Sequence, residues 1–126
     1  MSLILLLKEE EYTNMKIMEE TLKRGGCTYD VRVKQFYRGN GYIVSMGLYE
    51  YRVSLDAFND EVIASYIACH WHDLCRENRY LGTWIDKNTV YLDISLEFET
   101  KSKAIWYAIK NDQKSIYNIK EGVIEI

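Results

Sequence analysis

The stretch that decides the fold is "YLGTWIDKNTVYLDISLEF", residues 80–98. Its second half alternates apolar and polar residues, and one face of the resulting strand is apolar throughout: Val90, Leu92, Ile94, Leu96 and Phe98. A period of two is the pattern of a strand with one face toward the core. Lys87-Asn88 separates this strand from the apolar segment before it, so we expect an antiparallel hairpin.

Further strands and one helix are predicted after this hairpin. Residues 100–112, "TKSKAIWYAIKND", have the period of an amphipathic helix with Ile105, Ala108 and Ile109 facing inward. The segments "SIYNI" and "GVIEI" that follow are short and rich in β-branched residues. They predict two more strands of the same sheet.

The first third of the chain predicts a strand, a helix and a meander. The apolar run Leu3–Leu7 is too short to span a membrane or to act as a secretory signal, so we expect a buried strand. Residues 9–26 read as a helix that begins with acids and ends at two glycines, with a spaced apolar set of Tyr12, Met15, Met18 and Leu22. Residues 29–55 then alternate as three strands, with a turn at Asn40-Gly41.

A long helix is predicted between the meander and the central hairpin. Asp56 has the character of an N-cap, and the helical period runs to about Asn78. One arc of this helix is mostly apolar: Val62, Ile63, Tyr66, Ile67, His70 and Leu74. Together the segments predict one α+β domain over residues 1–126, with a mainly antiparallel sheet and about three helices packed on it.

Charge and composition limit the classes of function. The chain has 16 basic and 19 acidic residues, a net charge of −3, and these charges are interspersed. Direct nucleic-acid binding needs a basic face, so a protein partner is the better expectation. No export signal or membrane segment is evident, so we expect the chain in the reducing cytoplasm. The many Tyr, Lys, Ile and Asn residues favour a low-GC bacterium or its phage as the source.

The stretch "ACHWHDLC", residues 68–75, holds both histidines and two of the three cysteines. On a continuous helix Cys69, His72 and Cys75 would lie one turn apart, on the side away from the apolar arc. With Cys27 from a neighbouring strand they predict a closed, structural zinc site, whereas His70 is expected in the core. Plain burial of these side chains and redox use are the alternatives.

Catalysis has weaker support in the sequence. Cys69 and His72 are a conceivable nucleophile pair, and Asp86 and Asp93 a conceivable acid and base. Neither pair comes with an oxyanion hole or a glycine-rich phosphate loop, and carboxylates on a polar strand face are usually solvated. We therefore expect no enzyme, and no catalytic residue is assigned.

Aromatic residues are dense in the last third of the chain. Tyr and Trp at a surface are favoured anchors for protein partners. The residues concerned are Trp84, Tyr91, Trp106, Tyr107 and Tyr117. The alternative is that they cover the second face of the sheet under a helix, so the partner-binding surface stays open.

Residues 80–126 resemble a module of small phage and mobile-element proteins. The likeness is carried by ten residues: Gly82, Trp84, Asp86, Tyr91, Leu92, Asp93, Asn111, Gln113, Ile116 and Tyr117. In this module the Asn-Gln step is usually contiguous, whereas here Asp112 separates Asn111 from Gln113. The module implies no functional residue.

The chain also resembles anti-CRISPR proteins, which are small, acidic and phage-borne. Some of these, including inhibitors of Cas9, combine an α+β fold with bound zinc. The resemblance implies a stoichiometric inhibitor that occupies a protein surface of a bacterial defence effector. A small metal-dependent or thiol enzyme and a general interaction domain are the alternative functions.

Overall fold

The central hairpin forms as the sequence predicts. In the computed structural model, which describes the backbone of residues 3–126 and side chains from Lys8 onward, β5 (Tyr80–Asp86) pairs with β6 (Thr89–Phe98). The register places Leu81 opposite Ile94, and the turn is closed by Lys87 at φ 57°. The alternating apolar residues of β6 are buried up to Leu96, and Phe98 is half-buried.

The predicted meander before the hairpin is wrong, because its three strands pair with β5 or β6 of the hairpin and not with one another. Both β3 (Tyr42–Ser45) and β4 (Tyr51–Ser54) lie along the edge of β6 opposite β5. Tyr42 pairs with Phe98 and Tyr51 with Leu92, so the two short strands share one long neighbour. A ten-residue strand offers both of them a hydrogen-bonding edge and an apolar face, which neither short strand offers the other.

The remaining strands complete one antiparallel sheet in the order β2-β1-β5-β6-β3-β7-β8, with β4 beside β3 on β6. They are β1 (Gly26–Asp30), β2 (Gln35–Phe36), β7 (Ser115–Asn118) and β8 (Gly122–Glu125). The predicted strand through Val33 ends at Asp30, because the Asp30 carboxylate accepts hydrogen bonds from the backbone of Arg32 and Val33. Both C-terminal strands are confirmed.

The first helix, α1 (Leu3–Arg24), is longer than predicted. Leu3–Leu7 is helical and not a strand, because leucine is a good helix former and nothing separates this run from the acids that follow. The side chains of this run lie outside the described residues. Gly25, at φ 85°, ends the helix with an N–H bonded to the Thr21 carbonyl. Within the described residues, no helix has the length and apolarity needed to cross a membrane.

The buried face of α1 also differs from the prediction. Ile17 and Thr21 are fully buried, whereas Tyr12, Met15 and Leu22 are exposed. Thr21 is held there by its hydroxyl, which lies 2.6 Å from the hydroxyl of Thr83 on β5. The apolar set read from the sequence is therefore mostly on the solvent side.

The predicted long helix is broken in two. Asn59, not Asp56, is the N-cap of α2 (Asp60–Cys69), and its side chain accepts from the N–H of Val62. His70 leaves the helical conformation (φ −117°, ψ 24°), and the short helix α3 (Trp71–Leu74) follows. The apolar arc is nonetheless confirmed, since its members are buried or half-buried.

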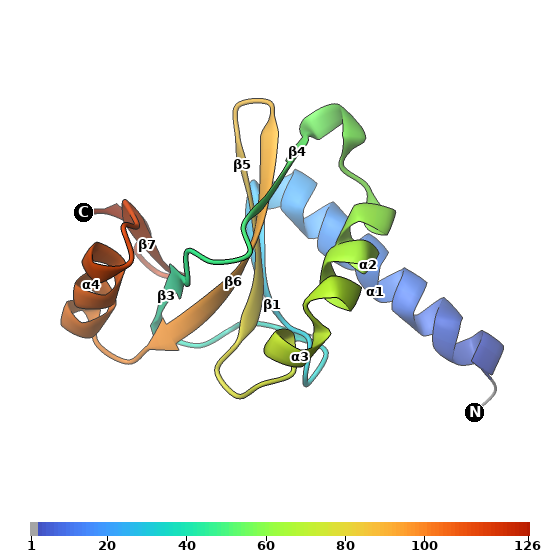
Figure 1. Cartoon of the computed structure of the whole chain (residues 1–126), viewed down its shortest axis with the longest axis horizontal. Helices are drawn as coiled ribbons and strands as arrows, with labels where there is room; N and C mark the ends of the chain where they lie inside the picture. The colour runs from blue at the N-terminus through green and yellow to red at the C-terminus, as the bar shows by residue number, and fades with distance from the viewer. Residues whose placement is uncertain (1–2) are drawn as a thin grey trace.

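The last helix, α4 (Lys101–Lys110), is confirmed in position and is capped by Thr100. Ala104 and Ala108 pack against Val44 and Ile116 in a second, smaller core. Ile109 is 62% exposed, so its inward placement was wrong. The α+β prediction holds: α1 and α2 lie side by side against the hairpin, and α4 covers the other end of the sheet beside the C-terminus (Figure 1).

Candidate functional site

The break at His70 changes the geometry of the predicted zinc ligands. Cys69 ends α2 and His72 belongs to α3, so the one-turn spacing of a continuous helix is lost. Both residues are exposed, and Cys75 is half-buried just after α3. Cys27 lies in β1 with its sulfur 3.3 Å from the Thr83 hydroxyl, at the contact between α1 and β5.

These residues do not fit a preformed zinc site. Within residues 3–126 as described, no three His, Cys, Asp or Glu side chains are grouped so that they could hold a metal ion. Burial also raises the pKa of the Cys27 thiol, which disfavours the thiolate that zinc requires. The zinc assignment stays a prediction, and elemental analysis of the purified chain tests it: about one zinc per chain would mean that the ligands rearrange on binding.

The conceivable catalytic pairs are not brought together as pairs. Cys69 lines a pocket between α2 and β4, whereas His72 lines a separate groove between α1 and α2. On the hairpin Asp86 lies opposite Thr89 and Asp93 lies opposite Gly82. That separation along the strands is four residue pairs, or about 13 Å at the usual rise.

Asp93 is buried, in contrast to the solvated carboxylate expected on a polar strand face. It is 6% exposed and accepts a hydrogen bond from the Ser95 hydroxyl at 3.0 Å. Burial is the largest influence on its pKa, which rises to about 6; hydrogen bonds from Ser95 and Ser45 oppose the rise and the charge of Glu50 adds to it. No ion pair holds this carboxyl group among the residues that the structure describes, and it lies in the sheet interior.

The aromatic residues of the last third do not form one surface. Trp84 stacks on Tyr91 at 4.4 Å across the hairpin, with the Arg52 guanidinium 5.3 Å from the Tyr91 ring. Trp106 lies on the outer side of α4, 62% exposed, with the Lys110 ammonium 4.7 Å from its ring. Tyr107 is half-buried, and Tyr117 is exposed on β7.

A groove of about 1010 Å³ lies between α1 and the α2–α3 segment. One wall is α1 from Lys8 to Asn14, and the other is α2 and α3 from Ala64 to His72. The floor is the end of β1 and the turn after it, where Tyr29 and Val31 are buried core residues. The groove is thus built on the main core.

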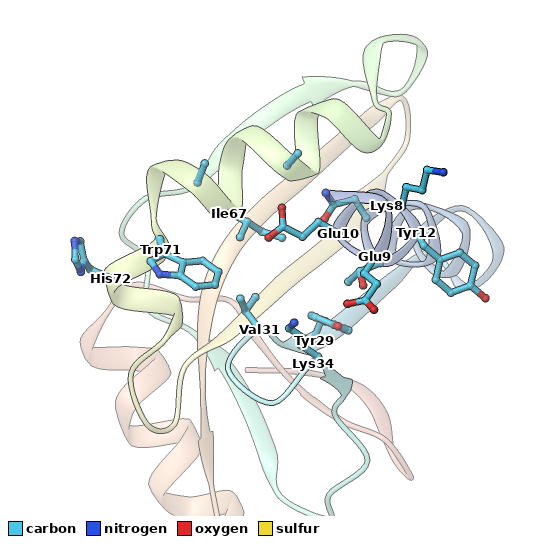
Figure 2. Close-up of a pocket in the computed structure, with 14 residues that line it drawn as sticks. Lys8, Glu9, Glu10, Tyr12, Tyr29, Val31, Lys34, Ile67, Trp71 and His72 are labelled. Atoms are coloured by element: carbon cyan, nitrogen blue, oxygen red, sulfur yellow. The ribbon is translucent and has the colours of Figure 1, made fainter. Parts of the chain in front are cut away.

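The side chains in the groove combine an apolar centre with a charged margin (Figure 2). Ile67, Trp71 and Val31 converge at its centre. Glu10 points into it from α1, whereas His72 points away. Two acids, Glu9 and Glu10, are balanced by two lysines, Lys8 and Lys34.

Trp71 is, with Tyr12, one of two exposed aromatic residues that line this groove, and it was not among the predicted binding residues. Its side chain is 49% exposed although it is the largest apolar group of the segment. It stands within "ACHWHDLC", where the cysteines and histidines draw attention to metal chemistry. The available signal was a tryptophan flanked by two polar residues.

No family model, no curated protein and no solved structure matches this chain.

Proposed function

We propose that this chain is a protein-binding inhibitor of a bacterial defence effector, of the anti-CRISPR type, with Cas9 as the first target to test. It acts by stoichiometric binding in the bacterial cytoplasm and not by catalysis. The resemblance to small phage proteins supports the type of target. The groove between α1 and α2 supports binding as the mode of action.

The groove is chemically suited to a protein segment with apolar side chains. Its centre is apolar, and half-exposed aromatic residues in such places are frequent hot spots of protein interfaces. Its lysines are matched by glutamates, so it lacks the excess of positive charge that a phosphate backbone requires. The partner segment is therefore expected to be apolar at its centre and mixed in charge at its ends.

The single observation that carries the proposal is Trp71, 49% exposed, beside Ile67 and Val31 in the groove. A tryptophan indole held half out of the core leaves a large apolar surface in water. A partner side chain that covers it recovers that free energy on binding.

The test is a DNA-cleavage assay with guide-loaded Cas9 and increasing amounts of the purified chain. Inhibition should be complete near one chain per effector. Trp71→Ala should raise the concentration for half inhibition about 30-fold, which is the loss of a hot spot of about 2 kcal/mol. A second variant, Ala68→Arg, fills the groove without removing any contact of the core and should act in the same direction.

Trp106→Ala is the matched control, because Trp106 is also an exposed tryptophan but lies on α4, away from the groove. It should inhibit as the unmodified chain does. Full inhibition far below one chain per effector would point to an enzyme and contradict the proposal. Failure to inhibit Cas9 and the other Cas effectors would refute the assignment to this class.

A further inference from the structure

A second pocket, of about 620 Å³, lies on the other side of α2, between that helix and the segment leading into β4. Its volume is in the range of small-ligand sites. It is lined by the helix from Asn59 to His70 and by Tyr49, Glu50 and Tyr51. Neither the resemblance nor the proposed function assigns a role to it.

Three rings are gathered at one end of this pocket. The His70 ring lies with its centroid 4.4 Å from the Tyr66 ring and 5.0 Å from the Tyr49 ring. Tyr66 is almost fully buried and donates a hydrogen bond of 2.7 Å from its hydroxyl to the Tyr49 carbonyl. The helix and the segment before β4 are thereby tied together at the rings.

The backbone at Tyr49 is held in an unusual conformation. Its φ is 62°, in the left-handed region that a tyrosine rarely adopts. The hydrogen bond from Tyr66 to its carbonyl fixes this conformation, which keeps the Tyr49 ring beside His70. Strained residues of this kind are concentrated at binding sites, where surrounding contacts maintain them.

The charges around the pocket are acidic. Glu50 and Glu61 line it, and no lysine or arginine is among its described lining residues. Arg52 pairs with Glu50 at 3.0 Å, but its guanidinium also lies over Tyr91 of β6. Glu61 makes no ion pair within the described part of the chain.

The end of α2 adds to this negative character. The ring cluster lies where the ten-residue helix ends, at Cys69 and His70. The carboxyl end of a helix carries a partial negative charge and favours cations. The aromatic faces and the helix end at the ring cluster, and the Glu61 carboxylate in the first turn of the same helix, therefore favour a cationic ligand.

We propose that this pocket binds an organic cation, either an ammonium or a guanidinium group, against the exposed ring of Tyr49, which Tyr66 and His70 hold in place, with Glu61 as its counter-charge. A small metabolite or a lysine or arginine side chain of a protein partner supplies such a group. The groove on the other side of α2 lacks this preference, because its charges cancel.

The experiment is an NMR titration of the labelled chain with choline and with N-acetylargininamide. The neutral isostere of choline, 3,3-dimethylbutan-1-ol, is the matched control ligand. We expect both cations to shift the signals of Tyr49, Tyr66 and His70 at millimolar concentrations and the isostere to shift them much less. Equal binding of choline and its isostere would refute the proposal, as would no response to either cation.

Two variants locate the site, and one controls for them. Glu61→Gln keeps the shape of an exposed side chain and should weaken cation binding about threefold to tenfold, as should Tyr49→Leu. Tyr117→Leu removes an exposed tyrosine from β7, outside both this pocket and the groove, and should change nothing. Unchanged affinity in both pocket variants would overturn the site.

A further titration with a peptide distinguishes the two possible sources of the cation, a protein side chain and a free metabolite. If an arginine-containing peptide binds at least tenfold more tightly than N-acetylargininamide, and a version with citrulline in its place does not, the ligand is a side chain of a protein. If the small cations bind as well as the peptide, the ligand is a free metabolite. Both results require the same charge at the same rings.

Discussion

The two faces of β6 are buried to a similar depth along their central residues but differ in chemistry. On one face Val90, Leu92 and Ile94 are completely buried against α1, α2 and the rest of the main core. On the other face Asp93 and Ser95 are also buried, yet they are polar. One face is closed by apolar packing, and at Asp93 and Ser95 the other is closed around a hydrogen-bonded carboxyl group.

This difference shows how burial of the same depth has opposite consequences. An apolar side chain gains free energy on leaving water, in proportion to its area. A carboxyl group loses hydration, and its pKa rises until the neutral form is favoured. The apolar face of β6 therefore stabilises the sheet at every pH, and the polar face does so best at low pH.

The largest expected effect is on the apolar face. Leu92→Ala removes a side chain with no exposed surface and leaves a cavity, so the free energy of unfolding should fall by about 2–5 kcal/mol. Urea denaturation measures it. Leu22→Ala, the same change at a position 50% exposed on α1, should cost well under about 1 kcal/mol. Similar losses at both positions would remove the contrast between core and surface.

The pH dependence of the polar face comes next. The pKa of Asp93 is raised from 3.8 to about 6 in the folded chain, so the folded state binds this proton more tightly than the unfolded state. Stability should therefore fall as the pH rises from about 4 to 6, by at most about 3 kcal/mol.

Comparison with Asp93→Asn isolates this contribution from the other acids. The asparagine variant cannot ionise, so its stability should fall less across the same pH window. Urea denaturation at half-unit steps of pH gives the difference between the two curves. Parallel curves would show that Asp93 titrates normally in the folded chain.

Gly82 tests how closely the polar face is packed. A Cβ at this position would lie 2.3 Å from Asp93 Oδ1 and 3.2 Å from the Ser95 hydroxyl oxygen. Gly82→Ala should therefore cost about 1–3 kcal/mol, measured by urea denaturation. The same change in an Asp93→Ala background should cost less, because the nearest atom is gone. Equal costs in both backgrounds would mean that the strain arises elsewhere.

The smallest effect is expected at the solvent margin of the polar face. Arg52→Gln removes the guanidinium from the half-buried Tyr91 ring and from the exposed Glu50. The cost should be about 0.5–1 kcal/mol, measured by thermal or urea denaturation. A loss as large as that of Leu92→Ala would show that the margin supports the sheet as much as the core does.

Local patterns in the sequence predicted the helices and strands better than they predicted which strands pair with each other. The hairpin 80–98, the helix after Thr100 and the two C-terminal strands carry their own turn, cap and alternation signals. The strands β3 and β4 were recognised as segments but paired wrongly, because pairing depends on a strand far away in the chain. The buried face of α1 was predicted wrongly for a similar reason. Thr21 lies on that face because its hydroxyl contacts the hydroxyl of Thr83, which is far away in the sequence.

The candidate sites depended still more on long-range contacts. The cysteines and histidines were read on one continuous helix, whereas His70 interrupts it without a glycine or proline to mark the break. Trp71 lines the groove because α1 lies beside α2. Tyr49 lies in the acidic pocket because its carbonyl accepts a hydrogen bond from the hydroxyl of Tyr66. Such contacts join residues that local spacing does not relate.

The sequence by itself determined the α+β class, the central hairpin and the apolar arc on α2, because alternation and helical period act over a few neighbouring residues. Only the tertiary structure decided which strands share β6, where α2 ends, that Asp93 is buried, and that a groove and an acidic pocket lie on opposite sides of α2. These features arise when distant segments compete for the same apolar surface and the same hydrogen bonds, and the outcome depends on the whole chain.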